Sequence, residues 1–215
     1  MIFSLIVKGG VIMITIILGS IAALAIILER AWALWKIRLN FSRFSQEVFL
    51  SIERGLLQKA LEQCDHVRHP IGAVFKLGIM NRSLKREELE SLMEREGEEQ
   101  IQYLEHYLGA LLNIIGVEPM LGFLVTIVGL IRAFMAWEQI GSNITVNALA
   151  AGIYQAMITT AAGLIVAIPG YILYHLIIGK IKSQAQEMSY YGNELIDVLS
   201  RSRTHVPAKG TEART

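Results

Sequence analysis

A few polar side chains stand inside long apolar stretches of this sequence, and their types could do chemistry there. They are Glu118, Thr126, Arg132, Gln155, Thr159 and Thr160. A polar group inside a membrane is costly unless it is satisfied, so each needs a structural or functional explanation. Hydroxyl and amide groups donate and accept hydrogen bonds, and a carboxyl group can also carry a proton. A route for protons through an apolar medium is the chemistry that such a set could support.

For Thr126 and Thr160 there is a simpler alternative, which is to donate to a backbone carbonyl one turn earlier in their own helix. Gln155 is harder to satisfy in that way, because its amide needs several partners. Successive helical residues turn by about 100°, so Gln155 and Thr160 lie about 140° apart around a helix. We therefore place Thr160 on a pore face, together with Gly152 and Ala156.

The other polar residues of these spans are given different positions. Gln155 and Thr159 are predicted to lie away from the pore face and to make interhelical polar contacts. Arg132 lies five residues before Trp137, where it can snorkel to the outer interface or stand at a pore mouth. Glu118 precedes Pro119, which interrupts helical hydrogen bonding, and the acid is expected in water at the inner pore mouth.

Membrane-spanning helices must position these residues. The chain is 53% hydrophobic and 18% charged, whereas about a quarter of residues are charged in soluble domains. About 20 apolar residues cross a membrane as a helix. Three segments qualify: 1–30, 117–138 and 148–179. The first runs directly into Glu29-Arg30 and is longer than the apolar part of a signal peptide, so we expect it to be retained.

Lysine and arginine residues set the expected orientation, because they are enriched on the cytoplasmic side. They follow the first and third segments, whereas the loop 139–147 has none. Region 31–116 and the extension 180–200 are therefore predicted to be cytoplasmic and helical, with the loop and the N-terminus periplasmic. The polar tail 201–215 is predicted to be disordered.

The cytoplasmic region is predicted to form helical hairpins, with a boundary at His69-Pro70. Its last helix carries eight acids against three bases between Lys85 and Glu105 and is expected to continue into the second span. The acidic face is either a solvated face of an amphipathic helix or a docking surface. The net charge of +1 does not favour nucleic acid, and the single cysteine, Cys64, allows no intramolecular disulfide.

Small residues recur in the second and third spans at intervals of three or four. Such residues let membrane helices approach closely. The predicted packing residues are Gly122, Gly129, Gly152, Ala156, Gly163 and Pro169. Two small-residue rows on the third span predict a helix packed on more than one side inside an oligomer, whereas the bulky first span is expected to face lipid.

Two longer motifs carry a family resemblance. Residues 118–134, EPMLGFLVTIVGLIRAF, resemble the second-span motif APLLGLLGTVxGMIxAF of ExbB and TolQ proteins. Residues 148–169 end in TTAAGLIVAIP and resemble the third-span motif, and Leu28-Glu-Arg-Ala-Trp32 is similar to the family after the first span. The chain thus resembles the ExbB/TolQ/MotA proton channel family. The flagellar-type branch usually has four spans, so three favour the ExbB/TolQ branch.

The resemblance implies an all-α integral membrane protein that assembles into a homo-oligomeric ring, a pentamer, in the bacterial inner membrane. The ring would hold a dimer of an ExbD/TolR-like single-span partner, whose membrane aspartate carries the proton. By motif, Thr126 and Thr160 line the proton route. Proton flow would do work on a TonB- or TolA-like protein. No enzyme activity, cofactor or metal is implied.

Three positions depart from the motifs. Glu118 replaces alanine, Val125 replaces glycine, and Gln155 replaces a glutamate found in many members. Glutamine cannot take up and release protons, so the partner's carboxylate is expected to be needed for transfer, and the chain alone should conduct poorly.

Two other functions compete with this interpretation. A passive scaffold would anchor a partner without conducting, and Thr160→Val would separate the two hypotheses. A small-solute transporter is disfavoured because the two-fold internal repeat and the charged binding site expected of one are absent from the sequence.

Overall fold

The structure is a computed structural model that describes residues 2–140 and 146–204. The side chains of residues 2–11, 136, 139, 140, 146–149, 151, 152, 155, 203 and 204 lie outside the described part. Every regular element in the described ranges is an α-helix. Three helical stretches, within Ile12–Lys36, Arg86–Met135 and Ala156–Ser202, are long and apolar enough to cross a membrane. The predicted all-α class and the three spans agree with this.

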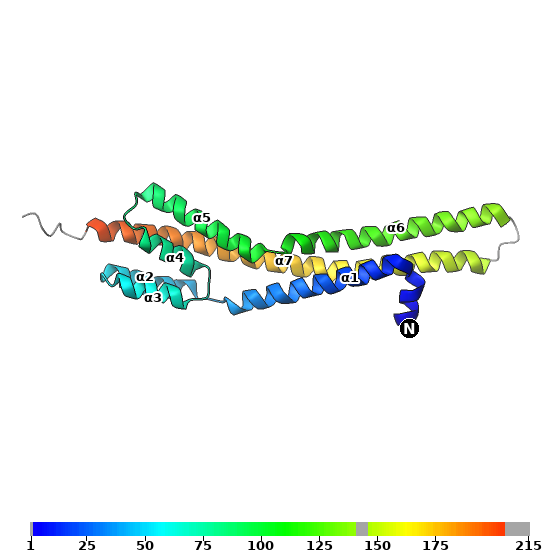
Figure 1. Ribbon diagram of the computed structural model, residues 1–215, viewed down its shortest axis with the longest axis horizontal. Helices are drawn as coiled ribbons and strands as arrows, with labels where there is room; N and C mark the ends of the chain where they lie inside the picture. The colour runs from blue at the N-terminus through cyan, green and yellow to red at the C-terminus, as the bar shows by residue number, and fades with distance from the viewer. Residues whose placement is uncertain (1, 141–145, 205–215) are drawn as a thin grey trace, which may run out of the picture. The chain divides into compact units, whose positions relative to one another are not determined.

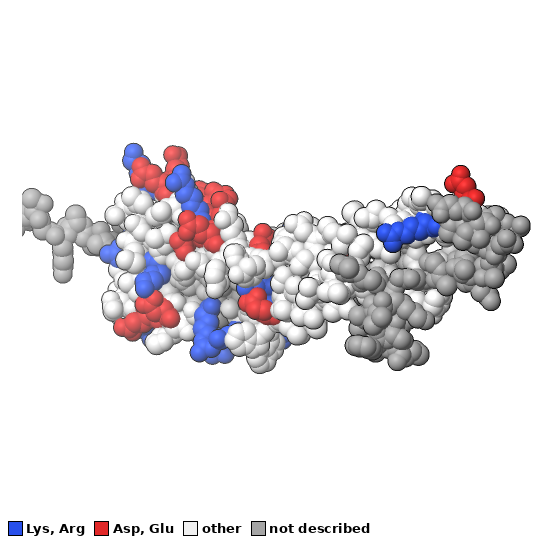
Figure 2. All heavy atoms as spheres, turned by 45° about the vertical axis from the view of Figure 1, so that its right-hand side comes forward, with Lys and Arg blue, Asp and Glu red and all other residues white. Residues whose placement is uncertain are grey.

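The chain divides into two compact units. The first, here called the apolar unit, comprises Met1–Ala31 and His106–Ile178, and the second, the charged unit, comprises Trp32–Glu105 and Gly179–Thr215. Figure 2 shows that the described surface of the apolar unit is mostly white, whereas blue and red side chains crowd over the charged unit. This division is the one that the charge pattern of the sequence predicts for a membrane part and an aqueous part.

The apolar unit contains α6 (Leu108–Ile140) and portions of α1 (Ile2–Lys36) and α7 (Val146–Thr204). In Figure 1 the green α6 runs beside the yellow N-terminal half of α7. One stripe of α1 is buried, with Met13, Ile16, Ala23 and Ile27 at intervals of three, four and seven. The opposite side of α1 exposes Ile14, Leu18, Ile21, Leu24 and Leu28, which suits the lipid-facing role expected for this helix.

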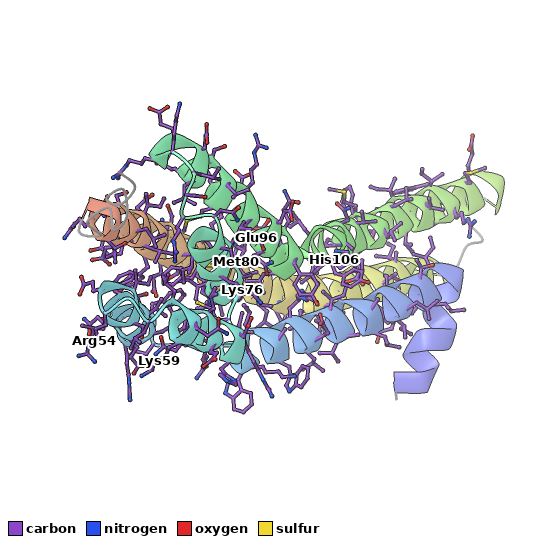
Figure 3. The ribbon with its side chains drawn as sticks, turned by 60° about the vertical axis from the view of Figure 1, so that its left-hand side comes forward. Arg54, Lys59, Lys76, Met80, Glu96 and His106 are labelled. Atoms are coloured by element: carbon purple, nitrogen blue, oxygen red, sulfur yellow. The ribbon has the colours of Figure 1, made fainter. Side chains whose placement is uncertain are left out.

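The charged unit consists of four shorter helices gathered along the C-terminal part of α7, as Figure 1 shows. They are α2 (Phe41–Glu53), α3 (Leu57–His66), α4 (Ile71–Met80) and α5 (Arg86–Glu105). The Asn40 side chain caps α2 by accepting from the Arg43 amide at 3.2 Å. Figure 3 shows Arg54 and Lys59 at the α2–α3 connection and Lys76 on α4. Lys76 pairs with Asp65 at 2.6 Å.

One hydrophobic core joins these helices to α7. Val48 and Ile52 of α2 are buried with Phe75 of α4, Met93 of α5 and Leu195 of α7. The predicted apolar spacing of Phe44, Val48 and Ile52 is therefore the buried face of α2. The predicted boundary at His69-Pro70 is also confirmed, because α3 ends at His66 and α4 begins at Ile71.

Three helix boundaries differ from the predictions. The helix of residues 85–105 does not continue into the second span, because α5 ends at Glu105 and Tyr107 adopts a positive φ of 66° before α6 begins. Pro119 does not begin a helix but lies within α6, eleven residues after its start. The predicted tail is helical as far as Thr204.

The predicted third span and the extension after it form one continuous helix. Residues 148–179 and 180–200 belong to the single helix α7, and the first predicted span extends to Lys36 in α1. Of the predicted loop 139–147, residues 141–145 lie outside the described residues, as do residues 205–215 of the tail.

Candidate functional site

The candidate site is a pair of threonines on facing helices of the apolar unit. Thr126 lies on α6 and Thr160 on α7, and their Oγ1 atoms are 2.5 Å apart. Both side chains are half-buried in the single chain. The sequence places them 34 residues apart, so it is the antiparallel packing of α6 on α7 that brings the hydroxyl groups together.

Small residues permit this approach. A Cβ atom at Gly122 would come within 2.8 Å of the Thr160 Cα, closer than real Cβ contacts allow, and within 3.1 Å of the Thr159 carbonyl oxygen, tighter than most real Cβ contacts. One turn earlier on α6, a Cβ at Gly163 of α7 would lie 2.8 Å from the Glu118 carbonyl oxygen. The α6 and α7 backbones are thus in contact at two levels, as small residues allow in membrane helices.

The threonine hydroxyls bond across the two helices at shorter distances than along their own. Thr160 Oγ1 donates to the Gly122 carbonyl at 2.8 Å, and its own-helix acceptor, Ala156 O, is 3.4 Å away. Thr126 Oγ1 reaches Ala156 O at 3.1 Å and its own-helix acceptor, Gly122 O, at 3.3 Å. The own-helix bonds expected of membrane threonines are therefore present, but they are the longer of the contacts that each hydroxyl makes.

Four oxygen atoms share only two hydroxyl hydrogens, which gives the pair two complementary arrangements. In one, Thr126 donates to Thr160, which donates to the Gly122 carbonyl. In the other, Thr160 donates to Thr126, which donates to the Ala156 carbonyl. Both use short contacts of 3.1 Å or less. A hydrogen-bonded chain that can reverse its direction is the local chemistry that a proton relay needs, and each direction leaves one carbonyl free to accept elsewhere.

The remaining predicted residues lie around the pair rather than in it. Ala156 and Thr159 are buried, and Gly129 is half-buried. Pro169 and Arg132 are exposed on the single chain. The predicted interhelical contact of Gln155 and the packing role of Gly152 fall on positions whose surroundings lie outside the described residues. Thr160 was predicted to face a pore with Ala156; in the single chain both face α6.

Glu118 differs from its predicted position in water. Its side chain is only 3% exposed, and its carboxyl group lies against Gly19 of α1, where an added Cβ would overlap Oε1. The contact of Gly170 with Ile115 is a further close approach that sequence reasoning missed. The small residues Gly19 and Ser20 in an otherwise mostly bulky stretch of α1 were the available signal for the first of these contacts.

One titratable group in the charged unit is strongly perturbed. His69 is buried, and its Nδ1 accepts from the Ile71 amide at 3.1 Å while its ring meets Phe41 edge-on at a centroid distance of 4.6 Å. Burial lowers the pKa of His69 to about 4. The imidazole is therefore neutral, and it caps the start of α4 by accepting from the Ile71 amide.

The single cysteine is also perturbed by burial, which raises the pKa of the Cys64 thiol to about 12, so this cysteine is a packing residue. No group of three or more possible metal ligands occurs among the described residues.

Comparison with known proteins yields one family and several relatives. The sequence profile described as the MotA/TolQ/ExbB proton channel family matches residues 51–190. The ExbB-like 1 protein of Synechocystis is 32% identical over 194 residues, covering 87% of this chain and 75% of that protein. The ExbB homolog of Methanothermobacter thermautotrophicus is 34% identical, covering 84% of this chain and 64% of its own length. TolQ of Haemophilus influenzae is 30% identical over 47% of this chain and 44% of its own.

Proposed function

Because this chain belongs to the MotA/TolQ/ExbB proton channel family, we propose that it is the ring-forming subunit of a proton-driven motor, with Thr126 and Thr160 lining the proton route. The observation that carries the proposal is the reversible hydrogen-bond chain of these two hydroxyls. The pair lies in a multi-pass membrane protein, where polar side chains need hydrogen-bond partners, and these two hydroxyls supply partners to each other.

The proposal includes the assembly. Several copies, five by family resemblance, form a ring around the membrane helices of a dimeric ExbD/TolR-like partner. That partner supplies the membrane carboxylate, since Gln155 cannot titrate. Proton flow through the bacterial inner membrane then does mechanical work on a TonB- or TolA-like protein. The N-terminus and the loop 139–147 are periplasmic and the charged unit is cytoplasmic, in keeping with its lysines and arginines. The chain carries out no enzymatic reaction in this scheme.

Thr160→Val tests the proposal, because valine keeps the shape of threonine and removes the hydroxyl. The chain and its co-purified partner are reconstituted into phosphatidylethanolamine–phosphatidylglycerol vesicles, and partner-dependent proton flux is measured with an internal pH dye. We expect Thr160→Val to lose most of the flux while the complex still assembles, and Thr160→Ser to keep it.

Thr15→Val is the matched control, since Thr15 is an exposed membrane threonine of α1. It should conduct like the unaltered chain. Unchanged flux in Thr160→Val, or work on the downstream protein without any flux in the unaltered complex, would favour the passive scaffold instead.

A further inference from the structure

Glu118 is an acidic side chain that the threonine route does not use. It is the only Asp, Glu, Lys, Arg or His in residues 108–131 of α6, and residues 12–28 of α1 and 156–174 of α7 have none. The side chain is 97% buried in the apolar unit, since its exposed fraction is 3%. Both carboxyl oxygens lack a hydrogen-bond partner among the described residues.

The close contacts at Glu118 come from glycines and an apolar side chain. On α1, Gly19 leaves the space that Oε1 occupies, and its neighbour Ser20 donates to the Ile17 carbonyl at 2.8 Å. On α6 itself, Ile114 lines the same space. On α7, Gly163 packs on the Glu118 backbone.

The charged groups nearest in sequence among the described side chains of these helices are remote from the carboxyl. Arg132 lies 14 residues further along α6, about 21 Å at the helical rise. On α1, Arg30 pairs with Glu29 at 2.5 Å and lies 11 residues from Gly19, about 16 Å along the helix. His175 lies 12 residues beyond Gly163 on α7, about 18 Å.

An ionised carboxylate is unfavourable in such a place. A charge buried without donors or a counter-ion costs several kcal/mol, whereas a protonated carboxyl group carries only a neutral dipole. Geometry therefore favours the acid with its proton bound. Loss of the proton would make water entry at the Gly19 contact favourable, because the carboxylate then needs donors.

The Glu118 side chain lies close in the sequence of α6 to a partner of the threonine pair. Glu118 lies one turn before Gly122 on α6, and the Gly122 carbonyl accepts from Thr160. We propose that Glu118 is a proton-binding site of this chain, neutral at rest, that exchanges its proton with the threonine route. In the exchange the O–H bond of Glu118 breaks, a water molecule accepts the proton, and a carboxylate remains until a proton returns. The exchange step rests on the proposed function, whereas the binding of the proton does not.

Infrared spectroscopy tests the binding step without a partner. The full chain is reconstituted into phosphatidylethanolamine–phosphatidylglycerol vesicles at neutral pH, and the spectrum of Glu118→Gln is subtracted from that of the unaltered chain. We expect a protonated-carboxyl C=O band that shifts in D₂O. Carboxylate bands in the difference spectrum would overturn the proposal. Glu138→Gln removes an exposed acid of the same helix and should remove no protonated-carboxyl band.

A second variant keeps the test decisive if Glu118→Gln does not fold. Gly19→Ala places a methyl group where Oε1 lies, so the carboxyl group must move. We expect the same C=O band at a shifted frequency. A band that is unchanged in Gly19→Ala would belong to another acid and would contradict the assignment.

Proton flux with the co-purified partner tests the exchange step. We expect Glu118→Gln to lower the flux on the order of a hundredfold, the low end of what a positioned proton-transfer group contributes. Glu118→Asp should recover part of it. Equal flux in Glu118→Gln and the unaltered complex would remove Glu118 from the route. Absence of flux from the unaltered complex would instead contradict the proposed function and leave the infrared result to decide on the proton-binding site.

Discussion

At the scale of single residues, the chemistry of this chain depends on which groups are buried together. The sequence identified Thr126 and Thr160 as polar groups in apolar spans, and the family motif pointed to both. Their direct contact at 2.5 Å depends on the register of α6 against α7, which local residue patterns do not contain. The burial of Glu118 was missed for the same reason, because the space it fills is provided by Gly19, 99 residues earlier in the sequence.

His69 gives a pH prediction at this scale. Its pKa is about 4 in the folded chain and about 6.5 when unfolded. The unfolded state therefore binds more protons between these values, and stability rises with pH there. The contribution is complete above pH 6.5 and is lost as the pH falls towards 4. At pH 5 the loss should be about 2 kcal/mol.

His69→Asn checks this prediction, because asparagine can accept from the Ile71 amide but does not titrate. Thermal unfolding of the detergent-solubilised full chain at pH 7 and pH 5 is the measurement. The variant should lose less stability between the two pH values than the unaltered chain. His66→Asn, at an exposed position of α3, should keep the original pH dependence. An equal pH dependence in His69→Asn and the unaltered chain would contradict the assignment.

At the scale of helices, sequence patterns predicted the kinds of element better than their ends. The apolar runs identified the three helices that, in the described part of the chain, are long and apolar enough to cross a membrane, and the spacing of Phe44, Val48 and Ile52 identified the buried face of α2. The break at Tyr107 carries no proline or glycine, so no local signal marks it. The helix boundary predicted at Pro119 was wrong, because α6 continues through this proline. Neighbouring groups can satisfy the backbone hydrogen-bonding groups that a proline leaves free in a membrane helix.

The contact between α6 and α7 predicts the effect of an added methyl group. Gly122→Ala would press on the Thr160 backbone, which cannot rotate away as a side chain could. We expect a loss of about 1–3 kcal/mol, which is typical of overpacking, and a longer distance between the two threonines. Thermal unfolding in detergent measures the loss.

Gly109→Ala is the matched control on the same helix, because nothing lies within 4 Å of a Cβ at Gly109. It should leave the unfolding temperature unchanged or raise it, since alanine favours helices over glycine. Equal effects of Gly122→Ala and Gly109→Ala would argue against close packing at Gly122.

At the scale of the whole molecule, the charge pattern predicted a membrane part and an aqueous part, and the chain divides into an apolar unit and a charged unit. Assembly was inferred from small-residue rows and from the family. A single chain exposes large apolar side chains of α7 such as Met157 and Ile165, which lipid or neighbouring subunits would cover in the proposed ring.

Co-purification tests the assembly. We expect the full chain, extracted in mild detergent from its native membrane, to carry a single-span protein with an acidic residue in its span. Native mass spectrometry would give the number of copies of each chain, with more copies of this chain than of the partner. A partner whose span lacks an acid would contradict the proton mechanism, because Gln155 cannot replace that group.

The most direct measurement of the central claim is a double-mutant cycle on Thr126 and Thr160. Partner-dependent proton flux is compared for Thr126→Val, Thr160→Val and the double variant in the same vesicles. The two hydroxyls form one hydrogen-bond chain, so either substitution should break it. The double variant should therefore have the same proton flux as the single variant with the lower flux. Flux losses that multiply in the double variant would show that the threonines act separately and would contradict a shared relay.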